Sequence, residues 1–291
     1  MDKFTFYLNE KTIDFGIDTC KFFIGNNYAM KFDMLKTLRQ TYQNVKATEI
    51  MVEDNLTSKF TFNDSPVNIQ KGKFFEVNEY KEYKEDLKLK SKTITKTIIE
   101  KLFNTIENND TFQTLKILYE DFADELNKRT DYQIEELNLE LLFEPFGAKS
   151  LIKLLSYILT YKNEQINEYA LSYDETILLQ LKLIKTLDNL LEEGHIIVYY
   201  GANHLTPTIN NYIIHNDWAI TYFLIASEVS SINNPNDILL IDNKIVDLAD
   251  NHAVYEELVL PSSKNHTIET IKSIITQKIN SRKISIFSDN F

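Results

Sequence analysis

The run HIIVYYG, which ends at Gly201, constrains the fold more than any other segment of the chain. Its aliphatic and aromatic residues follow one another without the alternation that would leave one face of a strand in water. Such a run is typical of a strand that is buried on both faces in a parallel sheet. A helix pattern at 206–214 and strand patterns at 218–226 and 238–241 follow it. This order predicts a doubly wound α/β fold.

Strand patterns also open the chain. Apolar residues alternate at period two over 4–8 and 13–17, and the run Phe22-Phe23-Ile24 ends at Gly25. A helix pattern follows from 29 to about 44, with apolar residues recurring at three and four. The stretch 45–80 returns to strand patterns. Both ends of the sequence are therefore predicted to contribute to one α/β head.

The middle of the chain is predicted to be helical. Gly and Pro together number 11 of 291 residues, about 4%, where roughly 12% is ordinary. The predicted helices cover 93–108, 111–128, 148–160 and 174–193. We therefore predict an α/β head formed by 1–92 and 194–250 and an inserted helical leg at 93–193. A C-terminal extension at 251–291 is predicted to add a strand (254–260), an amphipathic helix and a last strand (284–287).

The loop that joins the third predicted strand to the first helix carries Gly25 and Lys31 at the spacing of a phosphate-binding loop, GxxxxGK[ST]. Met30 stands at the second glycine position, where backbone must approach a phosphate, and Phe32 at the hydroxyl position, where Mg²⁺ would bind. The run that ends with Tyr200 offers no carboxylate for the metal. Nucleotide hydrolysis, a degenerate relic of a P-loop and a chance spacing stay open as interpretations.

Acidic residues alternate with leucines in the segment LNLELLFEP. Alternation would place Glu136, Asn138 and Glu140 on one face of an extended segment. Such oxygen donors suit Ca²⁺, which takes 6–8 oxygen ligands in loose geometry. A solvated acidic face explains the same spacing.

Lysines gather in the segment YKEYKEDLKLKSKTITK, most densely at Lys88, Lys90, Lys92 and Lys96. The whole chain has a net charge of −12, which excludes a uniformly basic DNA-coating protein. A local cluster can still neutralise phosphates, because DNA responds to the local field. A solubilising surface is the alternative interpretation.

Neither histidine nor cysteine spacing predicts a metal site. The five histidines are scattered, and Cys20 is the sole cysteine, so a buried inert thiol is expected there. His204 follows a predicted sheet strand, which is where ligands of α/β proteins bind. The sequence has no run of ~18 uncharged apolar residues and no signal-peptide pattern at its start, so we expect a cytoplasmic protein without a membrane segment.

The order of these segments resembles the small CRISPR-associated Csn family that accompanies type II-A spacer acquisition. The resemblance runs over roughly 1–250 and is carried by TCKFFIGNNYAMKF, by KFFEVNEYKEYKEDLKLKSKTITKTIIEKL, by LNLELLFEP, and above all by ETILLQLKLIKTLDNLLEEGHIIVYYGANHLTPTINNYI with the segment that follows it. It implies a P-loop-ATPase-like head that lacks the catalytic groups, an inserted helical leg, a homotetrameric ring, and Ca²⁺ at the head–leg junction. The tail from about 251 resembles an addition that longer subfamilies carry.

The resemblance implies a non-enzymatic protein that binds the ends of double-stranded DNA without reading sequence and helps to capture new spacers. The implied partners are CRISPR integrase proteins and the RNA-guided effector nuclease. Carried over by residue, the calcium ligands fall on Glu136, Glu140 and Glu144, although Asn138 stands where the family usually has an acid. The DNA-facing lysines are assigned by clustering alone. They are Lys88, Lys90, Lys92 and Lys96.

Two other classes stay open beside this family. An active NTPase or phosphotransferase of P-loop type would use Lys31 and would turn over nucleotide with Mg²⁺. A protein-interaction scaffold would bind basic partners through an acidic leg and would not bind DNA at low salt.

Overall fold

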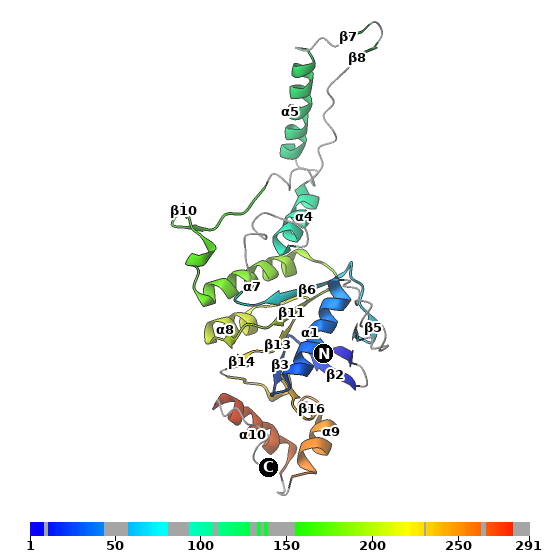
Figure 1. Cartoon of the computed structure of the whole chain (residues 1–291), viewed down its shortest axis with the longest axis vertical. Helices are drawn as coiled ribbons and strands as arrows, with labels where there is room; N and C mark the ends of the chain where they lie inside the picture. The colour runs from blue at the N-terminus through cyan, green and yellow to red at the C-terminus, as the bar shows by residue number, and fades with distance from the viewer. Residues whose placement is uncertain are drawn as a thin grey trace. The chain divides into compact units, whose positions relative to one another are not determined.

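The computed structural model describes most of the chain as two compact units. The described residues are 1–8, 11–43, 58–80, 93–106, 110–128, 133–134, 137–138, 155–229, 231–262 and 266–281. Unit 1 combines Met1–Lys81 with Ser172–Phe291, and unit 2 is Glu82–Leu171. Unit 2 is thus an insertion in a unit built from both ends of the chain. Figure 1 labels the elements of each unit.

The larger sheet of unit 1 has six strands in the order β16-β15-β3-β13-β11-β6. The strands are β3 (Cys20–Ile24), β6 (Gly72–Val77), β11 (His195–Tyr200), β13 (Thr221–Ile225), β15 (Ile238–Ile241) and β16 (Ile245–Asp247). Neighbours run parallel except β15 and β16. Every residue of β11 is buried. This confirms the α/β fold class and the prediction that the run before Gly201 is covered on both faces.

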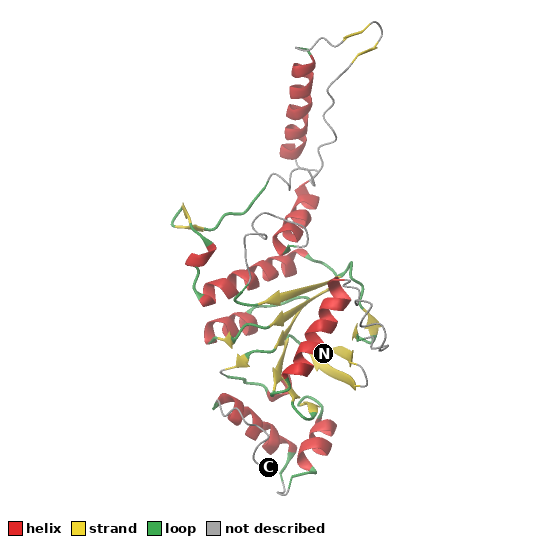
Figure 2. Ribbon diagram, in the orientation of Figure 1, coloured by secondary structure: helices red, strands yellow, loops and turns green. Residues whose placement is uncertain are grey.

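A second, antiparallel sheet and helix α1 cover one face of the larger sheet (Figure 2). The elements are β1 (Asp2–Leu8), β2 (Lys11–Ile17), β4 (Lys59–Phe62), β5 (Ser65–Pro66) and α1 (Tyr28–Gln43). Aromatic rings fill the space between the layers, and the ring of Phe4 lies 5.4 Å from that of Phe60 and 5.5 Å from that of Tyr222. The predicted strands at the start of the chain and the predicted helix at 29–44 are confirmed.

Helices α7 (Tyr173–Leu190) and α8 (Pro207–His215) also pack in unit 1. The Asp188 carboxylate of α7 is buried and accepts hydrogen bonds from the backbone N–H groups of Ala219 and Ile220 and from the Thr221 hydroxyl. Burial alone would raise its pKa, but these hydrogen bonds outweigh burial and lower the pKa. The predicted leg, 93–193, therefore extends past the end of unit 2, which is Leu171. Helix α7 belongs to unit 1, because Asp188 binds it to the start of β13.

The C-terminal part of unit 1 is helical over its described residues. Its elements are α9 (Asn251–Val254), the π-helical turn η3 (Tyr255–Val259) and α10 (Ile268–Asn280). The predicted strand at 254–260 is wrong. Asp250 caps a helix at this point, and Val254 and Leu258, four residues apart, bury one helical face. The predicted last strand, 284–287, lies outside the described residues.

The remaining described elements of unit 1 are β12 (His204–Leu205), β14 (Glu228–Val229) and the short 3₁₀ turn η2 (Pro235–Asp237). β12 and β14 pair in parallel.

The described residues of unit 2 form two longer helices and several short elements. They are α4 (Ile94–Ile106), α5 (Asp110–Asn127), β7 (Gln133–Ile134), β8 (Leu137–Asn138), β9 (Thr160–Tyr161), β10 (Glu164–Gln165) and the 3₁₀ turn η1 (Glu168–Ala170). The predicted helices at 93–108 and 111–128 are confirmed. The predicted helix at 148–160 lies outside the described residues up to 154, and its last residues are not helical, because Thr160 and Tyr161 pair in a hairpin with β10. Across the described residues of both units, no helix combines the length and the apolar composition that a membrane span needs.

Candidate functional site

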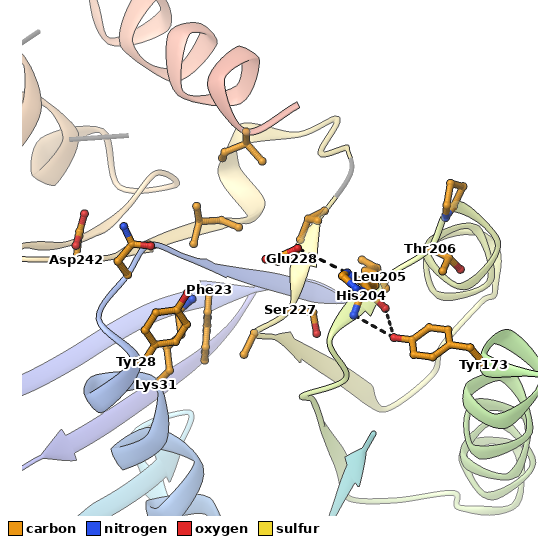
Figure 3. Close-up of a pocket in the computed structure, with 17 residues that line it drawn as sticks. Phe23, Tyr28, Lys31, Tyr173, His204, Leu205, Thr206, Ser227, Glu228 and Asp242 are labelled. Atoms are coloured by element: carbon orange, nitrogen blue, oxygen red, sulfur yellow. Dashed lines mark hydrogen bonds and ion pairs between the residues drawn. The ribbon is translucent and has the colours of Figure 1, made fainter. Parts of the chain in front are cut away.

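A cavity of about 500 Å³ opens in unit 1 beside the carboxyl ends of β3, β13 and β15. The β3–α1 loop and Lys31 form one wall, and β12 with Tyr173 forms another, as Figure 3 shows. Ligands of open α/β sheets bind outside the carboxyl ends of the strands. The cavity is therefore the candidate functional site of unit 1.

The β3–α1 loop is held by hydrogen bonds within the protein. Asn27 caps α1, since its side-chain oxygen accepts from the Met30 N–H at 3.0 Å. The Asn27 backbone N–H donates to the Ile241 carbonyl, and the Tyr28 N–H donates to the Asn26 carbonyl. A phosphate-binding loop instead turns its N–H groups toward the ligand. The structure thus brings Gly25 and Lys31 to one cavity, on a loop whose donors are largely committed to the protein itself.

The backbone at position 25 passes so close to the end of β15 that only glycine fits there. Its φ is +125°, and a Cβ atom would lie 2.4 Å from the Ile241 carbonyl oxygen. We expect Gly25→Ala to lower the free energy of unfolding by about 2–3 kcal/mol, because both the backbone conformation and the contact would be strained. Urea denaturation measures this. Gly201→Ala is the control: its Cβ would meet only the Tyr199 ring, at 3.2 Å, and φ is not positive. Equal losses in the two variants would contradict this explanation.

Lys31 is a buried cation in the wall of the cavity. Its side chain is 8% exposed. The amine lies 5.5 Å from the centroid of the Tyr28 ring, and within the described residues it makes no hydrogen bond or ion pair. Burial lowers the pKa of Lys31 to about 8, although the charge of Asp242 partly opposes this. A buried charge without a partner is costly, so this wall is suited to receive an anion.

Hydrogen bonds hold the backbone of the wall formed by β12 and Tyr173, and polar side chains lie at its rim. The Tyr173 hydroxyl accepts from the His204 backbone N–H at 3.0 Å and donates to the His204 carbonyl at 2.5 Å. The Tyr200 hydroxyl donates to the same carbonyl. The His204 ring is exposed, with Nδ1 3.6 Å from the Glu228 carboxylate. His204, the histidine that the sequence singled out, thus does line the cavity.

Lys96, which was predicted to face DNA, is not among the residues that line this cavity. Lys96 lies in α4, where its amine is 3.7 Å from the Glu100 carboxylate. The remaining residues that were predicted to contact DNA or to bind calcium lie outside the described residues. They are Lys88, Lys90, Lys92, Glu136, Glu140 and Glu144. Among the residues with a described position, no three acidic, histidine or cysteine side chains are grouped as a metal site would need. Burial raises the pKa of Cys20 to about 12, which agrees with an inert thiol.

Sequence reasoning missed Tyr28, Tyr173, Glu228 and Asp242 as wall residues of the cavity. Glu228 and Asp242 each follow a sheet strand closely, and that position was the signal available. Tyr173 begins a helix far from both in sequence, so only the chain topology brings it to the cavity.

No protein-family model matches the sequence, and no curated protein matches it. In structure, the chain is similar to Stu0660 of Streptococcus thermophilus, which is known from a crystal structure. The TM-score is 0.69 at 15% sequence identity, and the alignment covers 96% of this chain and 86% of that chain. At this identity the likeness shows a shared fold, and it extends over both units.

Proposed function

We propose that the protein is a Csn-type member of type II-A CRISPR systems, which binds the ends of double-stranded DNA and assists the acquisition of new spacers. The observation that carries this proposal is the likeness in fold to Stu0660 over 96% of the chain. The resemblance of segments such as TCKFFIGNNYAMKF to the Csn family supports the same proposal. The partners would be CRISPR integrase proteins and the RNA-guided effector nuclease, in the cytoplasm.

In this proposal a homotetrameric ring holds DNA through charge and shape. Lysines that face the channel would neutralise phosphates without reading bases. A ring admits a free DNA end, whereas closed circular DNA offers no end to thread. Ca²⁺ would be held by Glu136, Glu140 and Glu144, whose carboxylates are the ligand type that this cation prefers.

A non-enzymatic function agrees with the site around Lys31. Met30 and Phe32 replace the second glycine and the hydroxyl of a P-loop, and Phe32 is 57% exposed. The N–H groups of Asn27 and Tyr28 are bonded within the protein. An NTPase that uses Lys31 is the alternative, and Mg²⁺-stimulated nucleotide turnover that is lost in Lys31→Ala would favour it.

A mobility-shift assay tests the DNA proposal directly. Purified protein is mixed with linear and with covalently closed duplex of one sequence, in Ca²⁺ and in chelator, over a salt series. We expect binding to the linear form only, weakened by chelator and by salt. Equal binding to both forms would contradict threading. Lack of binding to either form at low salt would overturn the proposal.

Removing the clustered lysines should weaken binding and its dependence on salt. In the variant with Lys88, Lys90, Lys92 and Lys96 all replaced by alanine, we expect affinity for linear duplex to fall at least about tenfold. The slope of log affinity against log salt should become shallower by roughly 0.9 for each lost phosphate contact. The matched control replaces four exposed lysines of unit 1, namely Lys11, Lys59, Lys71 and Lys182. Equal losses in the two variants would show that total charge, and not the cluster, governs binding.

A further inference from the structure

We propose that the cavity beside Lys31 binds a small molecule that carries one anionic group on an apolar or aromatic body. This site is separate from the lysine cluster proposed for DNA, and it needs neither nucleotide hydrolysis nor a metal. Its volume of about 500 Å³ lies within the range of small-molecule sites, roughly 300–1,000 Å³. The charge, the apolar walls and the hydroxyl groups of the cavity each support the proposal.

The charge comes from Lys31 and from the helix that carries it. The Lys31 side chain is 8% exposed, and its amine makes no hydrogen bond or ion pair within the described chain. It stands in the first turn of α1, which contains no acidic residue, and the helix dipole adds positive potential at this end. Asp242 also lines the cavity but forms no ion pair with the amine. An anion here would supply the partner that the buried amine lacks.

The apolar walls come from several elements of unit 1. Phe23 of β3 and Leu205 of β12 are buried and line the cavity. Val229 of β14 and Ile279 of α10 also line it. Walls of this kind favour a ligand with apolar surface, so an inorganic anion alone would leave most of the cavity unused.

Three hydroxyl groups of the cavity are already engaged by the protein. Tyr173 donates to the His204 carbonyl, Thr206 donates to the Asp174 carboxylate at 2.9 Å, and Ser227 donates to the Ala202 carbonyl. These groups hold the walls together and leave Lys31 to orient the ligand. One buried cation, with Asp242 and Glu228 also in the lining, matches one anionic group better than the several charges of a nucleoside triphosphate.

The test uses two aromatic acids and a neutral analogue with the full-length protein. Isothermal titration calorimetry follows 1-naphthaleneacetate, 1-naphthyl phosphate and 1-naphthaleneacetamide, and inorganic phosphate serves as the anion without an apolar body. We expect one binding site per chain and an affinity for the amide at least tenfold lower than for the acid. Inorganic phosphate should not displace the bound acid. The acetate and phosphate ligands distinguish a carboxylate from a phosphate monoester. Equal affinity for acid and amide would overturn the proposal, as would no binding at millimolar concentration.

Variants test the role of Lys31. Lys31→Met should lower the affinity for the aromatic acid at least tenfold. Lys31→Arg keeps the charge, so its affinity should stay within about threefold of the native value. Lys36→Met is the control, because Lys36 lies on the same helix but outside the cavity lining. If Lys31→Met does not fold, the acid and amide comparison on the native chain decides. DNA binding by Lys31→Met should be unchanged, so either proposal can fail alone. Unchanged acid affinity in Lys31→Met would overturn the site.

Discussion

Replacing Lys21 by methionine is expected to lower the free energy of unfolding by about 3–5 kcal/mol. Lys21 is 1% exposed in the middle of the larger sheet. Its ammonium lies 2.5 Å from the Asp247 carboxylate and donates to the Asn236 carbonyl at 2.8 Å. Methionine fills a similar volume but leaves Asp247, which is 9% exposed, without its counter-charge. A buried charge that has lost its partner costs more than the pair itself contributes.

A second substitution separates the lost charge partner from lost packing. In Lys21→Met/Asp247→Asn the buried charge is gone, and the asparagine oxygen can still accept from the Ala249 N–H, as Asp247 does at 2.9 Å. We expect the double variant to recover at least about half of the loss. Urea unfolding followed by circular dichroism measures all variants.

Lys3→Met is the matched control for Lys21. Lys3 also forms an ion pair, with Asp64 at 2.9 Å, but both side chains are exposed. Solvent screens surface pairs of this kind, and they contribute little to stability, so the loss should be small. A loss in Lys21→Met no larger than in Lys3→Met would show that the buried pair does not hold β3 to β16.

The sheet of unit 1 could be predicted because its signals are local. The run before Gly201 is apolar at successive positions, and all of β11 is buried. Helix α1 was predicted from apolar spacing alone, and its residues Met34 and Leu38 are fully buried. Periodicity is the main signal of secondary structure, and in these segments it points to one answer.

The errors lie where local signals are ambiguous. The segment from Val254 to Leu260 alternates apolar and polar residues in part, so period two competed with the helical spacing of Val254 and Leu258. The Asp250 cap decides for a helix. Helix α7 was assigned to the leg because its neighbours in sequence are helical. Its buried Asp188 accepts hydrogen bonds from backbone N–H groups more than thirty positions later in the chain. The periodicity of apolar residues does not predict a contact of this kind.

The candidate site was predictable only in part. Gly25 and Lys31 stand in a motif-like segment, and His204 follows a strand, so sequence marks all three. Lys21 and Asp247 are 226 positions apart, and Tyr173 meets His204 across a strand and a loop. Contacts of this kind depend on how the strands are ordered, which spacing along the chain does not encode.

Acidification from pH 7 to pH 4 is expected to cost about 3 kcal/mol of unfolding free energy through His195 alone. His195 is 7% exposed. Its Nε2 lies 2.6 Å from the Tyr42 hydroxyl, and its ring stacks on Phe62 with centroids 4.4 Å apart. Burial lowers the pKa of His195 from 6.5 to about 4, although the charge of Asp2 partly opposes this. The folded state therefore holds the neutral ring, whose Nε2 can accept a hydrogen bond from the Tyr42 hydroxyl.

The sign of the effect follows from the two pKa values. The unfolded chain takes up a proton near pH 6.5, whereas the folded chain resists until about pH 4. The contribution of His195 is therefore fully present above pH 6.5 and is lost as the pH falls from 6.5 toward 4. At pH 5 the loss should be about 2 kcal/mol.

Two glutamine variants isolate this effect from the titration of carboxylates. His195→Gln cannot titrate but can still accept a hydrogen bond from Tyr42. Between pH 7.5 and pH 5 this variant should therefore lose about 2 kcal/mol less unfolding free energy than the native chain loses. His215→Gln, at an exposed position in the last turn of α8, should keep the native pH dependence. Urea unfolding at the two pH values gives the difference for each protein, and the shared carboxylate contribution cancels. If the native chain and His195→Gln lose equal stability, His195 is not the group that destabilises the fold in acid, and the carboxylates alone must account for it.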